Sequence, residues 1–347
     1  MKIEERIDSF VRLGEIFEQY GSTDDDPLAA ILKKAAMRAN LENPWFTQES
    51  IDYPVSSLAE LLRREKFLSW LSAYPRIMNN GSAPKTICVI MAGNIPMVGF
   101  HDLLCVLLSG HNILIKLSSK DTALLQAVTE ILFMINPEWK KRITVAGFPL
   151  TSFDAVIATG SNNSSRYFEY YFGKYPNILR RNRNSVAVIT GNETMEELAC
   201  LADDIFLYFG LGCRSISKIY LPEGYNFQVL TSPMEKYSQY RLHNKFMNNY
   251  EYNKAVLLMN SIPFIDCGYL LITENKSLSS PVSVLYYEYY NDLEELAYRL
   301  EEQSGQIQCI VSCLPLKNNW IKPGTAQHPE LWDYADNTDT MNFLLGI

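Results

Sequence analysis

The sequence predicts an α/β protein with two doubly wound α/β domains that are preceded by N-terminal helices. Short apolar runs, of the kind found in buried parallel strands, recur from residue 86 to residue 312. Segments with helical spacing separate most of these runs, and this alternation is typical of doubly wound parallel sheets. Before residue 75 the pattern is helical throughout, which sets the first part of the chain apart.

The first 75 residues are predicted to form three helices. Apolar residues recur at helical spacing over residues 3–17, and the Asp-Asp-Asp-Pro sequence at 24–27 predicts a helix end and a new cap. A second helix is expected over 28–38 and a third over 57–70. We expect these helices to pack on the domain that follows and to carry no chemistry.

A first α/β domain is predicted from four strand-like runs. Strands are expected over 86–92, 112–117, 143–146 and 155–158, with helices over 101–108, 121–135 and 164–172. Sheets of this kind bind ligands at the carboxyl ends of their strands. Because Asn94, Lys116, Gly160 and Ser161 follow or end such strands, we expect them at one edge of the sheet.

A second α/β domain is predicted to begin near residue 190. Strands expected over 185–190, 218–221, 282–287 and 306–312 alternate with helices over 194–206, 237–252 and 293–300, and a last apolar helix is expected over 341–345. These motifs divide the chain into three parts, residues 1–190, 191–320 and 321–347.

Length, charge and cysteine usage narrow the classes of function. The chain of 347 residues is long enough for about two domains, and its formal charge of −8 argues against a nucleic-acid partner. Polar residues interrupt the apolar region 87–117, so no membrane span is expected. Seven cysteines without metal-like spacing and the lack of an apolar leader indicate the reducing cytoplasm. The four histidines form no metal motif, so we expect no metal.

The stretch 208–222 places a cysteine where a thiol could meet a substrate. Cys213 follows a Gly-Leu-Gly bend and precedes Arg214. Glycines allow close approach and unusual backbone angles, and a thiolate requires positive potential nearby. From this stretch alone, Cys213 is either a nucleophile or a structural cysteine buried in a turn.

Three strand ends leave similar alternatives open. Lys116 either reaches a ribose or phosphate or extends to water. Gly160 and Ser161 either bind a pyrophosphate through backbone amides or form an ordinary helix cap. Asn94 is either a turn former or an amide donor for an oxyanion. The sequence contains neither GxGxxG nor GxxxxGK[ST], so neither standard phosphate loop applies.

Taken in chain order, these stretches resemble motifs of the aldehyde dehydrogenase superfamily. AGNIPMVGFHDLLCVLLSGHNILIKLSS is similar to its strand–turn–helix–strand segment, VIATGS to its cofactor-contacting Thr-Gly-Ser, and FGLGC to its nucleophile segment. RNSVAVI, GLGCRSISKIYLPEGY and AQHPELWDYAD resemble the fatty acyl-CoA reductase (LuxC-like) branch of bacterial luminescence systems. The resemblance covers about residues 85–347 and implies an aldehyde-dehydrogenase-like architecture.

For catalysis, the resemblance implies that Cys213 is the nucleophile. It also implies that Asn94 and the Cys213 backbone N–H form the oxyanion hole. Residues 180–182 fall where the family carries a water-activating glutamate, and they include no acid. Without that base, hydrolysis of an acyl-enzyme is expected to be slow, which suits acyl exchange with coenzyme A.

For the cofactor, the resemblance implies that Lys116 contacts the adenosine ribose or its phosphate. Gly160 and Ser161 are expected to contact the pyrophosphate. Ser119 falls where NAD-preferring relatives carry an acid for the ribose diol. A neutral residue there leaves room for a 2′-phosphate, so we expect NADPH rather than NADH.

The expected function is NADPH-dependent reduction of an acyl-CoA thioester to an aldehyde through a Cys213 acyl-enzyme, with coenzyme A as leaving group. The alternatives are an acyl-phosphate reductase, an aldehyde dehydrogenase working oxidatively, and a degenerate nucleotide-binding member. The last is favoured by residues 277–281, which offer no counterpart for the family's second ribose-holding acid.

The resemblance also assigns the three parts of the chain and their partners. Residues 1–190 are expected to bind NAD(P), residues 191–320 to carry the nucleophile, and residues 321–347 to serve oligomerisation. We expect a cytoplasmic homodimer that acts on small-molecule substrates, with an acyl-transferring or acyl-activating enzyme as a further partner.

Overall fold

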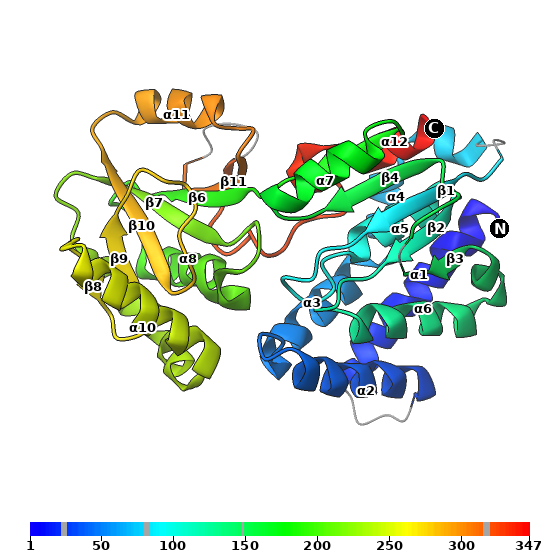
Figure 1. The fold of residues 1–347 in the computed structure, drawn as a ribbon, viewed down its shortest axis with the longest axis horizontal. Coiled ribbons are helices and arrows are strands. Elements are labelled where there is room, and N and C mark those ends of the chain that lie inside the picture. The colour runs from blue at the N-terminus through cyan, green and yellow to red at the C-terminus, as the bar shows by residue number, and fades with distance from the viewer. Residues whose placement is uncertain (22–25, 80–82, 148, 315–319) are drawn as a thin grey trace. The chain divides into compact units, whose positions relative to one another are not determined.

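The computed structural model describes residues 1–21, 26–79, 83–147, 149–314 and 320–347, which form two compact units. Unit 1 consists of Met1–Asn182 and Glu330–Ile347, and unit 2 consists of Arg183–Pro329. Each unit contains a β-sheet with helices packed against it (Figure 1). Residues 183–190 therefore belong to unit 2, and the segment 321–347 is divided between the two units.

Unit 1 is built on a five-stranded parallel sheet with the strand order β3-β2-β1-β4-β5. The strands are β1 (Thr86–Ile90), β2 (Asn112–Lys116), β3 (Ile143–Val145), β4 (Ala155–Thr159) and β5 (Asn177–Arg180). Side chains alternate along β1, so Ile87 and Val89 join one core and Cys88 and Ile90 join another. Helices cover both faces, as predicted for a parallel sheet.

The helices of unit 1 confirm most of the predicted pattern. They are α1 (Ile3–Glu18), α2 (Pro27–Glu42), α3 (Gln48–Leu61), α4 (Arg64–Leu71), α5 (Phe100–Ser109), α6 (Ala123–Ile135), α7 (Asn162–Phe172) and α12 (Thr340–Leu345), with 3₁₀ turns η1 (Gln19–Gly21), η2 (Pro75–Asn79), η3 (Pro137–Lys141) and η6 (Ala335–Asn337). The N-terminal helices share the Ile87 core with α5 and α6, and α7 lies against the Cys88 core through Phe168 and Phe172.

Two predictions for unit 1 were wrong. The single helix expected over 57–70 is interrupted at Leu62 and Arg63, where the backbone of Arg63 is extended and Leu62 is fully buried. Strand β5 was missed because its two inward-facing positions, Ile178 and Arg180, stand among polar residues and one of them is an arginine.

Residues 330–347 complete unit 1. The carbonyl of Leu331 accepts a hydrogen bond from His101 Nε2 at 2.9 Å, and the indole N–H of Trp70 donates to Tyr334 Oη at 2.8 Å. Met341 and Leu344 of α12 are fully buried in the same core as the N-terminal helices. This segment is therefore part of the hydrophobic core of unit 1, and its role in oligomerisation stays a prediction.

Unit 2 is built on a seven-stranded sheet with the order β12-β11-β6-β7-β10-β9-β8, in which the β8–β9 pair is antiparallel and the other described pairs are parallel. The strands are β6 (Asn184–Val188), β7 (Ile216–Pro222), β8 (Ile265–Asp266), β9 (Leu271–Glu274), β10 (Val284–Tyr290), β11 (Ile307–Val311) and β12 (Trp320–Ile321). The helices are α8 (Met195–Phe206), α9 (Phe227–Met234), α10 (Asn244–Met259) and α11 (Leu293–Glu302), with 3₁₀ turns η4 (Leu207–Gly210) and η5 (Glu235–Leu242). Helix α11 packs on one face through Leu296 and Leu300.

The helix predicted over 237–252 was wrong in its bounds. The chain forms the 3₁₀ helix η5 up to Leu242, and α10 begins only at Asn244. His243 separates the two and caps α10, because its Nδ1 accepts the Phe246 N–H at 3.1 Å.

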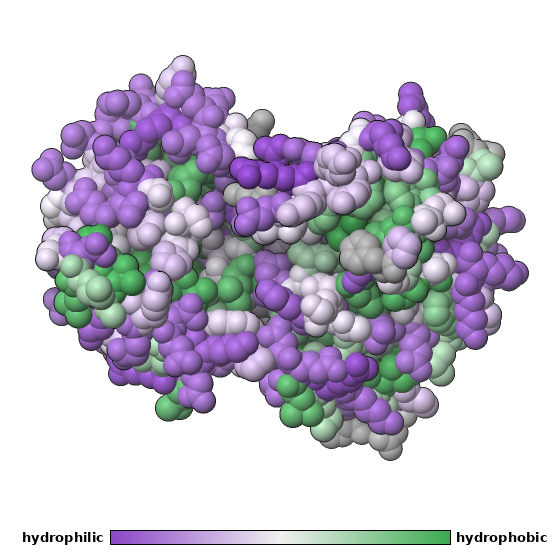
Figure 2. Space-filling model, in the orientation of Figure 1, coloured by the Kyte–Doolittle hydropathy of each residue, from purple (hydrophilic) through white to green (hydrophobic). Residues whose placement is uncertain are grey.

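The molecular surface is mostly polar in the face shown in Figure 2, with apolar side chains gathered in small patches. Within the described ranges, no helix is both long and apolar enough to cross a membrane.

Candidate functional site

The turn that follows β1 carries Asn94 and is held in place by the loop after β2. Met97 has a left-handed backbone (φ 58°), and its N–H donates to Asp121 Oδ2 at 2.7 Å. A Cβ on Gly93 would lie 2.5 Å from Ser118 Oγ, so only glycine permits this close approach of the turn to the β2 loop. The half-buried Asn94 is thus carried on a turn that is anchored at both ends.

The predicted cofactor residues of unit 1 gather at the same edge of its sheet as Asn94, which was predicted to be catalytic. Strands β2, β1 and β4 are adjacent and parallel, so Lys116, Asn94 and Gly160 all lie at their carboxyl ends. Ser119 is exposed, and the half-buried Lys116 donates through Nζ to the Leu117 carbonyl at 2.9 Å. Their roles stay predictions, but their common edge is the one where such sheets bind ligands.

Ser161 caps helix α7. Its Oγ accepts the backbone N–H of Ser164 at 3.3 Å, which confirms that the residue forms a helix cap. A cap does not exclude an anion at this end, because the other first-turn amides of α7 point the same way.

In unit 2, Cys213 lies at the tip of a tight turn between η4 and β7. The turn is closed twice, since Ser215 N donates to the Gly212 carbonyl at 3.1 Å and Gly212 N donates to Ser215 Oγ at 3.2 Å. From the neighbouring strand β6, the buried Ser185 Oγ donates to the Cys213 carbonyl at 2.9 Å. The backbone of Cys213 is therefore fixed on both sides, while the residue itself is partly exposed.

The residues before this turn adopt a left-handed backbone. Tyr208, Phe209 and Gly210 have φ values of 56°, 58° and 73°, which is unfavourable for the two aromatic residues. The Phe209 ring packs against Tyr240 and His243, each with ring centroids 4.5 Å away. Aromatic packing thus holds the chain in a strained conformation just before Cys213.

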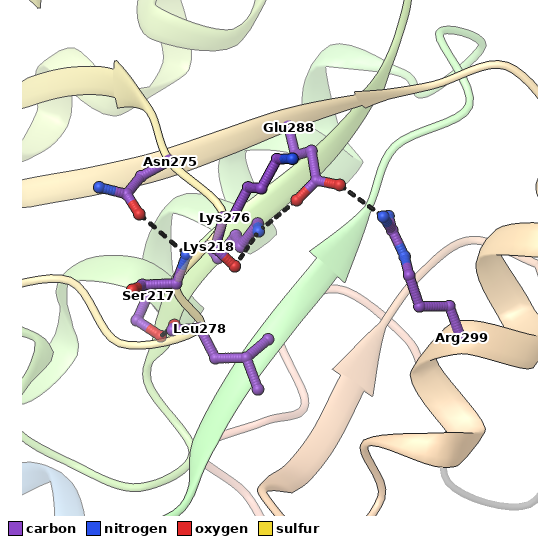
Figure 3. A network of polar contacts seen from close by, with 8 residues as sticks. Ser217, Lys218, Asn275, Lys276, Leu278, Glu288 and Arg299 are labelled. Carbon is purple, nitrogen blue, oxygen red and sulfur yellow. Dashed lines mark hydrogen bonds and ion pairs between the residues drawn. The ribbon is translucent and has the colours of Figure 1, made fainter.

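A buried ion pair joins Lys218 of β7, five residues after Cys213, to Glu288 of β10 (Figure 3). The fully buried Lys218 donates through Nζ to Glu288 Oε2 at 2.6 Å, and Arg299 donates to the other carboxylate oxygen at 2.6 Å. Burial lowers the pKa of Lys218, although Glu288 opposes this. Burial alone would raise the pKa of Glu288, but Lys218 and Arg299 hold it below its usual value.

The same strand fixes the loop 275–278. Lys218 Nζ donates to the Lys276 carbonyl at 3.0 Å, and Ser217 Oγ donates to the Leu278 carbonyl at 2.6 Å (Figure 3). Side chains on the strand that leaves the cysteine turn thus hold this loop through the loop's own backbone carbonyls. The loop overlaps residues 277–281, where the sequence offers no second ribose-holding acid.

Residues 180–182, where a water-activating glutamate was sought, begin with a buried arginine. Arg180 NH1 donates to Asp102 Oδ2 at 2.5 Å, and NH2 donates to Thr340 Oγ1 at 2.9 Å. Both charged side chains are less than a tenth exposed. Arg180 is therefore part of the core of unit 1, and its carboxylate partner is held by the guanidinium.

Behind the cysteine turn, Asp204 of α8 is fully buried and accepts hydrogen bonds from Gly324 N at 2.6 Å and Ala326 N at 3.0 Å. Burial raises the pKa of Asp204 to about 7, although these two amides oppose it. The folded protein therefore holds a proton here between about pH 4 and pH 7, where an unfolded aspartate has lost it. Asp204 thus makes the free energy of unfolding fall as pH rises through this window.

We expect the Asp204→Asn variant to lack this pH dependence. Between pH 5 and pH 7.5, the wild type should lose about 2 kcal/mol of unfolding free energy relative to the variant. Urea unfolding of both proteins at several pH values measures the difference. Parallel stability curves across this range would contradict the raised pKa.

Sequence reasoning missed the residues that hold the cysteine turn. Ser185 stands in the apolar run SVAVIT, and a hydroxyl in a buried strand requires a partner, so its position was the available signal. That the partner is the carbonyl of Cys213 depends on the pairing of β6 with β7.

Comparison with known proteins places these features in a family. Solved aldehyde dehydrogenases share the fold: aldehyde dehydrogenase 21 from Physcomitrella patens, in complex with the reaction product succinate, has a TM-score of 0.60 at 11% identity and covers 99% of this chain and 88% of its own. The aldehyde dehydrogenase KauB from Pseudomonas aeruginosa has a TM-score of 0.64 at 12% identity. The match covers 90% of this chain and 73% of KauB. An NADP dependent enzyme from E. coli has a TM-score of 0.60 at 12% identity. The match covers 94% of this chain and 75% of the E. coli enzyme.

Sequence comparison identifies the branch of this fold. Among curated proteins, none is significantly similar to this chain. The family model for acyl-CoA reductase (LuxC) matches residues 27–238, which is more than half of the chain and includes Asn94, Lys116 and Cys213. The chain therefore belongs to the LuxC family of acyl-CoA reductases and is an NAD(P)-dependent oxidoreductase of acyl and aldehyde groups.

Proposed function

We propose that this protein reduces an acyl-CoA thioester to an aldehyde with NADPH, through an acyl-enzyme on Cys213. The observation that carries the proposal is the turn Gly212–Ser215, which holds a partly exposed cysteine at its tip with its backbone fixed by Ser185. A nucleophile requires this combination of access and fixed geometry.

In the first stage, the Cys213 thiolate attacks the thioester carbonyl. A new carbon–sulfur bond forms, and the resulting oxyanion accepts a hydrogen bond from the Cys213 N–H. The resemblance to the superfamily assigns the second donor to the Asn94 side-chain amide. Collapse of this adduct breaks the bond to coenzyme A, which leaves as a thiolate and takes up a proton. The acyl group is then a thioester of Cys213.

When bound, the nicotinamide cofactor supplies hydride to that thioester. The acyl group thereby becomes the alkoxide of a thiohemiacetal on Cys213. Breaking its carbon–sulfur bond returns the electron pair to the cysteine and releases the aldehyde. Because residues 180–182 include no acid and Arg180 is paired with Asp102, no carboxylate is offered there to activate water.

The residues at the edge of the unit 1 sheet fit a phosphorylated dinucleotide. Lys116 provides a cation, the first turn of α7 provides amide donors beside Gly160 and Ser161, and the exposed Ser119 adds no negative charge. This donor set suits pyrophosphate and a 2′-phosphate.

The proposal is tested by incubating the protein with butyryl-, octanoyl- and tetradecanoyl-CoA in the absence of NADPH. Intact mass should increase by one acyl group for at least one chain length, with an equal amount of free coenzyme A released. Peptide mapping should place the group on Cys213. If no acyl-CoA forms an adduct, the proposal is wrong. An adduct formed only from an acyl phosphate would instead indicate an acyl-phosphate reductase.

NADPH is expected to raise the melting temperature more than NADH does at equal concentration. A tenfold difference in Kd corresponds to about 1.4 kcal/mol, or roughly 3 °C for a unit of this size. In the Ser119→Glu variant, a carboxylate beside the 2′-phosphate should reverse the order. An equal or larger shift with NADH in the wild type would overturn the NADPH assignment.

A further inference from the structure

The stretch Ala-Gln-His-Pro at 326–329 has no role in the chemistry described so far. The start of this stretch is anchored on helix α8, because the buried carboxylate of Asp204 accepts the backbone N–H groups of Gly324 and Ala326. Ala326 is fully buried and Gln327 is 7% exposed. A long amide side chain is thus held inside unit 2 by an anchored backbone.

The side chain of Gln327 reaches the cysteine turn. Its Nε2 donates to Ser215 Oγ at 3.2 Å, and the same oxygen accepts the Gly212 N–H at 3.2 Å. Ser215 is 3% exposed, so water does not compete freely for this oxygen. Two donors therefore fix the hydroxyl that closes the turn around Cys213.

This arrangement determines which backbone amides remain available to a substrate. The Gly212 N–H is used within the turn, and the Cys213 carbonyl is used by Ser185. The direction of the Cys213 N–H then depends on the peptide planes on either side of it, both of which are fixed. A displacement of about 1 Å at a reacting group can cost on the order of 100-fold in rate.

We propose that Gln327 is a positioning residue, which acts through Ser215 to hold the Cys213 turn in its reactive geometry. The inference rests on the proposed function, because it assumes that Cys213 is the nucleophile. Its effect passes through the Ser215 hydroxyl and the Gly212 backbone amide.

The test compares Gln327→Leu, which keeps most of the side-chain volume but has no donor, with Thr325→Ala as a matched control. Thr325 lies on the same segment, and among the contacts described for it the hydroxyl donates only to the Lys322 carbonyl, at 2.7 Å. For each variant we would measure acylation of Cys213 by octanoyl-CoA in a single turnover, and its alkylation by iodoacetamide, resolved by peptide mapping.

Gln327→Leu should slow acylation by about 10- to 100-fold, while KM for octanoyl-CoA changes by less than about threefold, because the turn and not the substrate site is altered. Thr325→Ala should match the wild type. Ser215→Ala should be at least as slow as Gln327→Leu, and the double variant should be no slower than Ser215→Ala, since both act through one hydroxyl.

Acylation rates of Gln327→Leu within twofold of Thr325→Ala would overturn the inference, as would fully additive effects in the double variant. If Gln327→Leu does not fold, Gln327→Met, which also lacks the donor, takes its place in both comparisons. Should the wild type form no acyl adduct, the proposed function fails, but alkylation still reports on the turn. Equal alkylation rates in all variants would then refute the positioning role by itself.

Discussion

Replacing Cys213 with alanine is expected to lower the rate of acyl-CoA reduction by at least about 10³-fold and to abolish the acyl adduct. The reason is that the alanine variant keeps the turn and its hydrogen bonds but has no sulfur to form the thioester. Serine at the same position should be nearly as inactive, because its hydroxyl remains protonated and is a far weaker nucleophile at neutral pH. Steady-state NADPH oxidation with octanoyl-CoA measures the loss.

The other cysteines provide matched controls. Burial raises the pKa of both Cys267 and Cys313 to about 11, so these thiols remain protonated at neutral pH and react slowly. Both are partly exposed, as Cys213 is. Cys267→Ala and Cys313→Ala should therefore retain activity within about twofold. Turnover that survives Cys213→Ala, or disappears with Cys313→Ala, would contradict the assignment of the nucleophile.

Asp102→Ala is expected to destabilise unit 1 by about 3 to 5 kcal/mol. It leaves the guanidinium of Arg180 buried without its counter-charge, and an unpaired buried charge is among the most costly defects in a protein core. For a unit of this size, the melting temperature should fall by about 10 °C or more. Differential scanning calorimetry, which separates transitions of the two units, is the suitable measurement.

Two further variants distinguish charge burial from simple loss of packing. Thr340→Val removes one hydrogen bond to Arg180 and should cost only about 1 kcal/mol. The double variant Asp102→Leu/Arg180→Met removes both charges and should be more stable than Asp102→Ala. Single and double variants that all melt at the wild-type temperature would show that the pair contributes little.

The alternation of strands and helices could be predicted because β1, β2, β3 and β4 are short and mainly apolar, and each is followed by turn residues. The run TICVIMA and the Asn94 turn illustrate this, since the signal lies within a dozen neighbouring residues. Strand β5 could not be predicted in this way. One of its two inward positions is Arg180, whose burial depends on Asp102, a residue 78 positions earlier in the chain.

The candidate site shows the same limit. Cys213 could be singled out from the Gly-Leu-Gly bend and the order of the neighbouring motifs. The groups that hold it could not, because Ser185 is 28 positions from Cys213 and Gln327 is 112 positions from Ser215. Such contacts are created by strand pairing and by the anchoring of a distant segment on Asp204, and no local pattern encodes them.

The division of unit 1 into two stretches of sequence has a consequence for biosynthesis. Residues 330–347 follow all of unit 2 in the chain, so a ribosome completes unit 2 before it delivers the last part of unit 1. At about 5 to 20 residues per second, the synthesis of unit 2 separates the two stretches of unit 1 by a time on the order of 10 s. During that time His111 lacks the Leu344 carbonyl and Arg180 lacks Thr340. A nascent chain halted before residue 330 would therefore carry a complete unit 2 and an unfinished unit 1.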